Sequence, residues 1–292
     1  MAGTDTTPGQ RLRALLAAAP TDGPVLAPGA YDALTARLVG QAGFDIVYMT
    51  GFGTSASLIG RPDVGLLTGT EMADNARRIA AAVDVPVIAD ADTGYGNALN
   101  VGRTVRLYEQ AGIAGIQLED QVTPKKCGHM SGKQVVALPE MIGKIHAAVD
   151  ARRDPATVVI ARTDAAAVDG LDAAIERAHA YREAGADVLF VEAPTSEADI
   201  EKVAGALAST APLLVGAHGR AGVRAGAVPD RHAPGDDRGR PLAAGRDPRR
   251  RRPVARRPPD LRRVHRPHRT ARGAGGRAAL RGLSPAARRP PS

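Results

Sequence analysis

The sequence predicts an α/β barrel of the TIM type, in which short parallel strands alternate with helices. Two patterns carry this prediction. Short, continuously apolar segments alternate with helical segments of 10–15 residues, as expected for strands that are buried on both faces. Polar residues recur just after the apolar segments, where a barrel of this type collects its functional side chains. The length of 292 residues also accommodates a barrel, which takes about 250 residues.

Seven strands are expected in the first 216 residues, from short apolar and β-branched runs that end at glycine, proline or charged residues. They are 25–28, 46–50, 86–90, 115–119, 158–162, 188–192 and 212–215. An open, doubly wound sheet competes with the barrel, but no glycine-rich dinucleotide turn follows the first strand. We therefore expect a (β/α)8 barrel that is truncated after its seventh strand.

The expected helices show apolar residues at helical spacing and recognisable end signals. They are 10–19, 33–42, 71–83, 100–111, 139–151, 171–184 and 197–207. Pro20 is expected to end the first helix, and Gly112 and Gly185 follow two others as stop signals. The strand run after residue 45 ends at residues 50–53, and a looped segment that contains residues 61–63 is expected to follow.

The composition changes abruptly after Gly216. Residues 217–292 contain 21 arginines and 5 aspartates but no lysine or glutamate, so this segment carries +16. The whole chain carries +8, which leaves −8 for residues 1–216. Because the basic segment also lacks Ile, Phe, Tyr and Met, it has too little apolar surface to offset the entropy of ordering. We predict an incomplete catalytic barrel domain, 1–216, and a disordered tail, 217–292.

Two interpretations of this tail compete. It is an arginine-rich arm that binds nucleic-acid phosphates, or it is the product of an alternative reading frame. Arg, Pro, Ala and Gly share GC-rich codons, lysine is absent, and the change falls where the fold still needs a strand. We favour the second interpretation, and a nucleic-acid partner is not expected.

The cysteine content and the apolar segments restrict the location of the protein. One cysteine excludes an intrachain disulfide framework and fits a reducing compartment. No basic region followed by an apolar stretch opens the sequence, and no apolar run approaches the roughly 20 residues that span a bilayer. We expect a cytoplasmic protein without a membrane partner.

The single cysteine lies in the segment Lys125-Lys126-Cys127-Gly128-His129. Neighbouring cations favour the thiolate form of a cysteine, so that its sulfur can exchange protons near neutral pH. A buried structural thiol is the usual alternative, but glycine and charged neighbours argue against burial here. The segment predicts a catalytic loop.

Acidic residues gather at two neighbouring strand ends. Asp90 and Asp92 follow one strand, Glu119 ends the next, and Asp63 lies in a loop that can reach them. Carboxylate oxygens suit Mg²⁺ or Mn²⁺, which retain several waters in protein sites. The alternative is that these acids cap helices and pair with surface bases.

Further strand ends carry candidates for binding an anionic substrate. Arg162 can hold a carboxylate in bidentate fashion, although an ion pair with Glu192 is an alternative. Tyr48 offers a phenol, and the backbone amides of residues 50–53 can receive an anion.

Together, these residues resemble the isocitrate lyase/phosphoenolpyruvate mutase superfamily over about residues 28–215. Residues 125–129 are similar to the lyase signature and 90–96 to the metal loop, and 119–121 and 161–164 also fit. The phosphonate-forming mutases of this superfamily lack the cysteine. Cys127 therefore favours the lyases, among which the short 2-methylisocitrate lyase and dimethylmalate lyase types are most similar.

The resemblance implies a Mg²⁺-dependent retro-aldol cleavage of a 2-hydroxy di- or tricarboxylate to a 2-oxo acid such as pyruvate and a carboxylate such as succinate. It implies Asp92 as the nearest metal ligand, with Asp63, Asp90 and Glu119 acting through bound waters. Cys127 would protonate the carbanion-like product, and Lys125 and His129 would tune the thiol. The implied substrate-binding residues are Tyr48, Thr50, Gly51, Phe52, Arg162 and Glu192.

The resemblance ends after Val215. Superfamily members continue with an asparagine-bearing segment, an eighth strand and helices exchanged between subunits, which makes a homo-oligomer the expectation for the family. Here Gly216-Ala217-His218-Gly219 follows instead. Oxaloacetate decarboxylase or hydrolase activity and phosphonate chemistry are the alternative enzymatic functions on the same barrel.

Overall fold

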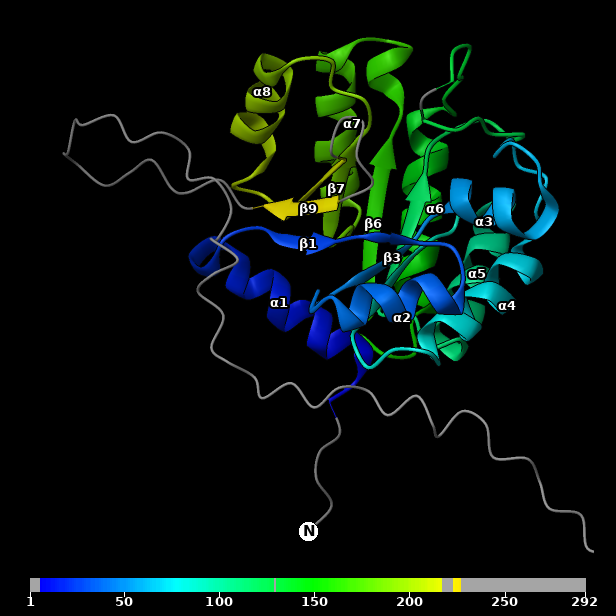
Figure 1. Ribbon diagram of the computed structural model, residues 1–292. Coiled ribbons are helices and arrows are strands. Elements are labelled where there is room, and N and C mark those ends of the chain that lie inside the picture. The colour runs from blue at the N-terminus through cyan, green and yellow to red at the C-terminus, as the bar shows by residue number, and fades with distance from the viewer. Residues whose placement is uncertain (1–5, 129, 217–222, 227–292) are drawn as a thin grey trace, which may run out of the picture. The chain divides into compact units, whose positions relative to one another are not determined.

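The computed structural model describes residues 6–128, 130–216 and 223–226, and it confirms the alternation of strands and helices (Figure 1). The strands are β1 (Val25–Ala27), β2 (Gly29–Ala30), β3 (Val47–Met49), β4 (Val87–Asp90), β5 (Gly115–Glu119), β6 (Val158–Thr163), β7 (Val188–Val191), β8 (Leu213–Gly216) and β9 (Val223–Gly226). The helices are α1 (Pro8–Asp22), α2 (Ala33–Gln41), α3 (Gly51–Ile59), α4 (Gly69–Ala80), α5 (Ala98–Gln110), α6 (Leu138–Ala151), the 3₁₀ turn η1 (Ala165–Ala167), α7 (Leu171–Glu183) and α8 (Glu197–Leu207).

The sheet follows the order of the sequence from β2 to β8, and each neighbouring pair is parallel. A doubly wound sheet would reverse its strand order at a switch point, and this one does not. All seven expected strand segments are present. The first of them is divided at Pro28 into two short strands, β1 and β2. The barrel prediction is confirmed.

The two edge strands of the sheet, β1 and β2, both come from the segment 25–30. In the order β1-β9-β8-β7-β6-β5-β4-β3-β2, the outermost strands are β1 and β2. β9 pairs antiparallel with both β8 and β1 and lies where a parallel eighth strand would stand. Strand pairing therefore extends past Gly216 into the four residues of β9, which we had assigned to the disordered tail. The unpaired backbone groups at the edges of β8 and β1 explain this pairing, because they need hydrogen-bond partners. The rest of the tail, 217–222 and 227–292, lies outside the described residues.

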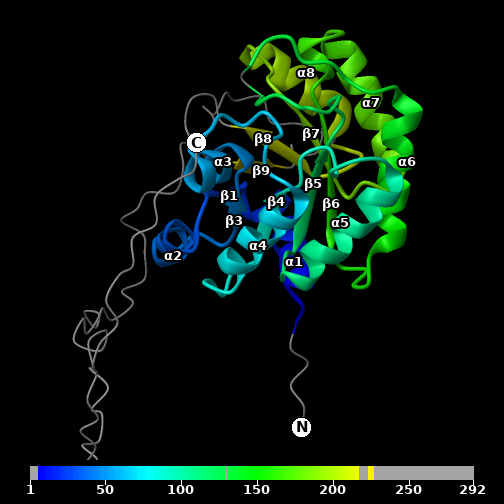
Figure 2. The same cartoon turned by 90° about the vertical axis from the view of Figure 1, so that its right-hand side faces the viewer.

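Two layers of apolar side chains surround the strands. Tyr48, Ile88, Ile160 and Phe190 belong to an inner cluster, whereas neighbours such as Val159 belong to the cluster between strands and helices. Successive strand residues point to opposite faces, so both clusters draw on the same strands. Figure 2 shows helices α2 to α8 around the strands. This double burial explains why the strands are continuously apolar.

Helix α1 contributes to the inner cluster through the fully buried Leu12. Arg13 fixes the helix further, since its guanidinium donates to the backbone oxygen of Ala156 at 2.9 Å and pairs with Asp187 at 2.9 Å. The helix runs through Pro20 and ends at Asp22, so the prediction that Pro20 stops it was wrong. A proline in the last turn disturbs only that turn, and Gly23 closes the helix by donating to Ala19.

Helix α3 was missed by the sequence analysis, which ended a strand run at residues 50–53 and expected a loop after it. Thr50 caps the helix by accepting a hydrogen bond from the Gly53 amide, and Gly60 ends it in the left-handed conformation. Within the described part of the chain, every helix is too short or too polar to cross a bilayer.

We predict that Gly9→Ala destabilises the fold by about 1–3 kcal/mol, because a Cβ there would lie 2.6 Å from the backbone of Ala156. Gly143→Ala in α6 is the matched control, since its Cβ meets nothing within 4 Å. The control should be neutral or stabilising, as glycine is unfavourable inside a helix. Urea unfolding measures both variants, and equal stabilities would contradict the close packing of α1.

Candidate active site

The predicted site residues lie at the carboxyl ends of consecutive parallel strands. Tyr48 is in β3, Asp90 ends β4, Glu119 ends β5, Arg162 is the penultimate residue of β6 and Glu192 follows β7. The neighbouring strands are paired in register, for example Glu119 with Arg162. One end of the barrel therefore collects the candidate side chains, as a TIM barrel requires of its active site.

Lys125 joins two of the predicted metal ligands. Its ammonium nitrogen lies 2.5 Å from Asp63 Oδ1 and 2.7 Å from Asp92 Oδ1, and its side chain is only 4% exposed. Burial alone would lower the pKa of Lys125, but the surrounding carboxylates, Asp90 and Asp92 above all, raise it. The loop that contains the cysteine is thereby attached to the acidic cluster.

Three carboxylates of this cluster, Asp63, Asp92 and Glu119, have pKa values above their ordinary range. Burial, followed by repulsion from Asp90, raises the pKa of Asp92 to about 7. Burial also raises the pKa of Asp63 and Glu119 above their ordinary values. Asp92 is held at a φ of +46°, a left-handed conformation that is uncommon for a residue with a side chain.

Asp90 is oriented by the backbone. Its Oδ2 accepts from the Gly51 amide at 3.2 Å and its Oδ1 from the Asp92 amide at 3.0 Å. A Cβ at Gly51 would lie 2.6 Å from Asp90 Oδ2, so this position needs glycine. The first turn of α3 is therefore placed directly against the acidic cluster.

Tyr48 is buried inside the barrel, and its hydroxyl donates to Gln117 Oε1 at 2.8 Å. Gln117 is fully buried and lies on the β5 strand. Burial, followed by repulsion from Asp90, raises the pKa of Tyr48 well above its ordinary value, so the phenol keeps its proton.

Arg162 is held by ion pairs on several sides. Its Nε and Nη2 bond the two oxygens of Asp164 at 2.9 and 3.0 Å, in the bidentate fashion that we expected for a substrate carboxylate. Glu119 Oε2 lies 3.4 Å from Arg162 Nε, and Glu192 Oε2 lies 3.7 Å from Nη1. The guanidinium carbon lies 5.3 Å from the centroid of the Phe190 ring. The pair with Glu192, one of our alternatives, is present.

Residues 125–128, which we call the cysteine loop, pack against this cationic group. Cys127 is partly exposed. A Cβ at Gly128 would overlap Glu192 Oε1 and lie 2.8 Å from Arg162 Nη2, so glycine permits this approach. The Gln121 amide holds the loop by donating to Lys126 O at 2.8 Å and to Glu119 Oε1 at 2.9 Å.

Three further predicted residues are Thr50, Phe52 and His129. The Thr50 hydroxyl caps α3 by accepting a hydrogen bond from the Gly53 amide, and Phe52 is 59% exposed. His129 lies outside the described residues.

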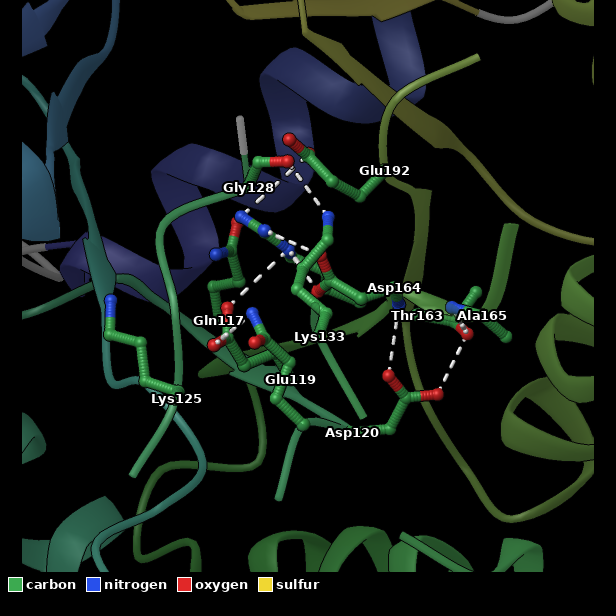
Figure 3. Close-up of polar contacts among 12 residues, drawn as sticks. Gln117, Glu119, Asp120, Lys125, Gly128, Lys133, Thr163, Asp164, Ala165 and Glu192 are labelled. Carbon is green, nitrogen blue, oxygen red and sulfur yellow. Dashed lines mark hydrogen bonds and ion pairs between the residues drawn. The ribbon is translucent and has the colours of Figure 1, made fainter. Parts of the chain in front are cut away.

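The sequence analysis missed four polar residues of the site, namely Gln117, Asp120, Lys133 and Asp164. Figure 3 shows how they connect the strand ends. Asp120 is fully buried and accepts from the Thr163 hydroxyl at 2.7 Å and the Asp164 amide at 2.9 Å. Tyr181 also donates to Asp120 at 2.7 Å, from helix α7. The sequence feature that could have indicated these residues is a polar side chain within an otherwise apolar strand, as in Ile-Gln-Leu-Glu-Asp.

The acidic cluster fits a divalent cation that keeps most of its waters. Within the described ranges, no three His, Cys, Asp or Glu side chains lie close enough to form a complete ligand set. Mg²⁺ needs only one or two carboxylates. Asp92 Oδ1 is buried, and its polar neighbour among the described residues is the Lys125 ammonium group at 2.7 Å. A carboxylate oxygen can accept more than one contact, so this atom fits a metal ion beside the ammonium group.

The sequence matches the family described as phosphoenolpyruvate phosphomutase over residues 12–227, and the chain belongs to this family. The 2,3-dimethylmalate lyase of Eubacterium barkeri is 60% identical over 179 residues, which are 61% of this chain and 62% of that protein. The probable 2-methylisocitrate lyase 2 of Corynebacterium glutamicum is 50% identical over 207 residues, 71% of this chain and 66% of that protein. The chain thus spans less than two thirds of the length of either relative.

Solved structures show the same relationship. A crystal structure of 2,3-dimethylmalate lyase, a PEP mutase/isocitrate lyase superfamily member, is 43% identical with a TM-score of 0.69, over 74% of this chain and 72% of that one. Oxaloacetate acetylhydrolase with 3,3-difluorooxalacetate is 43% identical with a TM-score of 0.68, over 71% and 70%. Phosphonopyruvate hydrolase with oxalate and Mg²⁺ is 38% identical with a TM-score of 0.64, over 71% of each chain.

We predict that Tyr48 and Gln117 are energetically coupled. Gln117→Leu should destabilise the fold by about 1–3 kcal/mol, because it leaves the Tyr48 hydroxyl buried without an acceptor. Tyr48→Phe removes that hydroxyl, so the double variant should lose less stability than the two single losses together, by about 1 kcal/mol. Urea unfolding of all four proteins measures this coupling, and simple additivity would contradict it.

Proposed function

We propose that the protein is a carbon–carbon lyase that cleaves a 2-hydroxy di- or tricarboxylate to a 2-oxo acid and a second carboxylate. The observation that carries the proposal is the attachment of the cysteine loop to the acidic cluster, through Lys125 bound to Asp63 and Asp92. This attachment supports a site that combines a proton donor with a metal ion at one end of the barrel. The similarity to 2,3-dimethylmalate lyase and 2-methylisocitrate lyase supports this proposal.

The reaction balances without an oxidant or reductant. The bond between the hydroxyl-bearing carbon and its neighbour breaks, and the hydroxyl group releases its proton to solvent water as it becomes the ketone of the 2-oxo acid. The electron pair remains on the neighbouring carbon, which then takes up a proton. We assign this proton to Cys127, a partly exposed residue whose chain neighbour Gly128 packs against Arg162 and Glu192. Lys125 and His129 are proposed to tune the thiol.

Substrate carboxylates are proposed to bind near Arg162 and Tyr48, whose donors contact Asp164 and Gln117 in this structure. Arg162 and Glu192 close one side of the site, and Tyr48 presents a protonated phenol inside the barrel. Thr50, Gly51 and Phe52 begin α3, whose amino end favours an anion. We propose that these three residues and Tyr48 hold the 2-oxo acid end.

We propose Mg²⁺, or Mn²⁺, as the cofactor. Asp92 would bind it directly, and Asp63, Asp90 and Glu119 through waters. When bound, the metal ion stabilises negative charge on the oxo-acid fragment. The phosphonopyruvate hydrolase structure with oxalate and Mg²⁺ supports this assignment. A reducing, cytoplasmic location is proposed because the thiol must stay reduced.

Hydrolysis of oxaloacetate is the second candidate function, because the chain is 43% identical to oxaloacetate acetylhydrolase over 71% of its length. Both functions use a 2-oxo or 2-hydroxy acid with at least two carboxylates, so both fit the same site. Parallel assays of 2-methylisocitrate, 2,3-dimethylmalate and oxaloacetate do.

We predict Mg²⁺-dependent release of pyruvate from 2-methylisocitrate or 2,3-dimethylmalate, measured by a coupled pyruvate assay. A chelator should abolish it, and Cys127→Ser should lower kcat by at least about 100-fold, within the range that general acid catalysis contributes. Serine is close in size to cysteine, so the thermal unfolding of the variant should match the parent protein. Full activity in Cys127→Ser would remove the thiol from the mechanism, and turnover of oxaloacetate alone would favour the second function.

A further inference from the structure

Lys133 is a buried cation that the proposed mechanism does not use. Its side chain is 2% exposed, and its ammonium group lies 2.7 Å from Asp164 Oδ1. The same nitrogen donates to the backbone oxygen of Gly128 at 2.8 Å. A buried ammonium group is costly unless it is paired and hydrogen-bonded, so these two contacts define where Lys133 can lie.

The two partners of Lys133 belong to different parts of the site (Figure 3). Gly128 directly follows Cys127, so the hydrogen bond holds the peptide group next to the thiol-bearing residue. Asp164 directly follows β6 and is fixed by Arg162 and by its own amide, which donates to Asp120. Lys133 thus connects the cysteine loop to the carboxyl end of β6.

Lys126 provides an internal contrast. Its ammonium group donates to the backbone oxygens of Gly132 at 2.7 Å and Ser131 at 3.4 Å, a few residues further along the same connection. Both lysines therefore contribute a positive charge near Cys127, but in these contacts only Lys133 reaches a strand end of the barrel.

We propose that Lys133 is a positioning residue, which joins the backbone beside Cys127 to Asp164 and thereby fixes the thiol relative to Arg162. Its catalytic consequence rests on the proposed function, in which Cys127 delivers the proton. The anchoring itself depends only on the contacts of Lys133.

Alkylation of Cys127 by iodoacetamide tests the anchor, because the chain has one cysteine and the rate reports that thiol alone. We expect Lys133→Met to raise the rate at least fivefold and Lys126→Met to leave it within twofold of the parent protein. Both changes remove one positive charge, which disfavours the thiolate and cannot raise the rate. An increase confined to Lys133→Met therefore reports a released loop, and Lys133→Arg should remain closer to the parent protein.

Equal alkylation rates in folded Lys133→Met and Lys126→Met would overturn the proposal. If Lys133→Met lacks the native circular dichroism spectrum, Lys133→Gln, which keeps a polar group in the buried space, replaces it in the comparison. A measurement on the parent protein needs no variant: an acetylating reagent should modify Lys126 at least tenfold faster than Lys133. Equal modification of the two lysines would also overturn the anchor.

The catalytic consequence has its own readout. Lys133→Met should lower kcat for pyruvate release at least tenfold with a smaller change in KM, and Lys133→Arg should recover part of the loss. Alkylation uses none of the proposed substrates, so the two proposals fail separately. An inactive parent protein would overturn the lyase assignment, whereas the alkylation comparison would still decide on Lys133.

Discussion

The ion pairs of Lys125 with Asp63 and Asp92 are the interaction on which the candidate site depends. Four carboxylates gather at the carboxyl ends of β4, β5 and a nearby loop, and burial raises the pKa of three of them. Such a cluster needs a cation, because buried like charges repel and lose their hydration. Lys125 supplies that charge from the cysteine loop. The electrostatics of the acidic cluster thus determine where Cys127 lies.

The cysteine loop is held from both sides of Cys127. Lys125, two residues before it, is bound by the carboxylates, and Gly128, directly after it, is bound by Lys133. The second attachment is supported by Asp164, which follows β6 and pairs with Lys133. Asp120, which follows β5, accepts a hydrogen bond from the Asp164 amide. A proton donor must be held within a fraction of an ångström to be effective, and two attachments achieve this better than one. The barrel ends supply the rigid support.

The sequence predicted the seven strand segments and the strand-end residues well, because doubly buried strands are continuously apolar and parallel strands end at the same edge. It did not predict α3, whose Gly-Phe-Gly-Thr start lacks a clear helical period. Gln117 and Asp120 were missed because their partners, Tyr48 and Tyr181, are more than 60 residues away in the chain. The pairing of β9 with β8 and β1 was equally non-local. Such contacts depend on register, which periodicity does not give.

Isotope incorporation tests the central claim most directly. The purified chain is incubated with 2,3-dimethylmalate and Mg²⁺ in D₂O, and the products are examined by NMR. Cleavage with protonation by an exchangeable thiol predicts equal amounts of pyruvate and propionate, with one deuterium on the carbon next to the propionate carboxyl group. The same incubation with Cys127→Ser should yield neither product in comparable amount. Absence of both products from the parent chain, or propionate without deuterium, would contradict the proposed lyase mechanism.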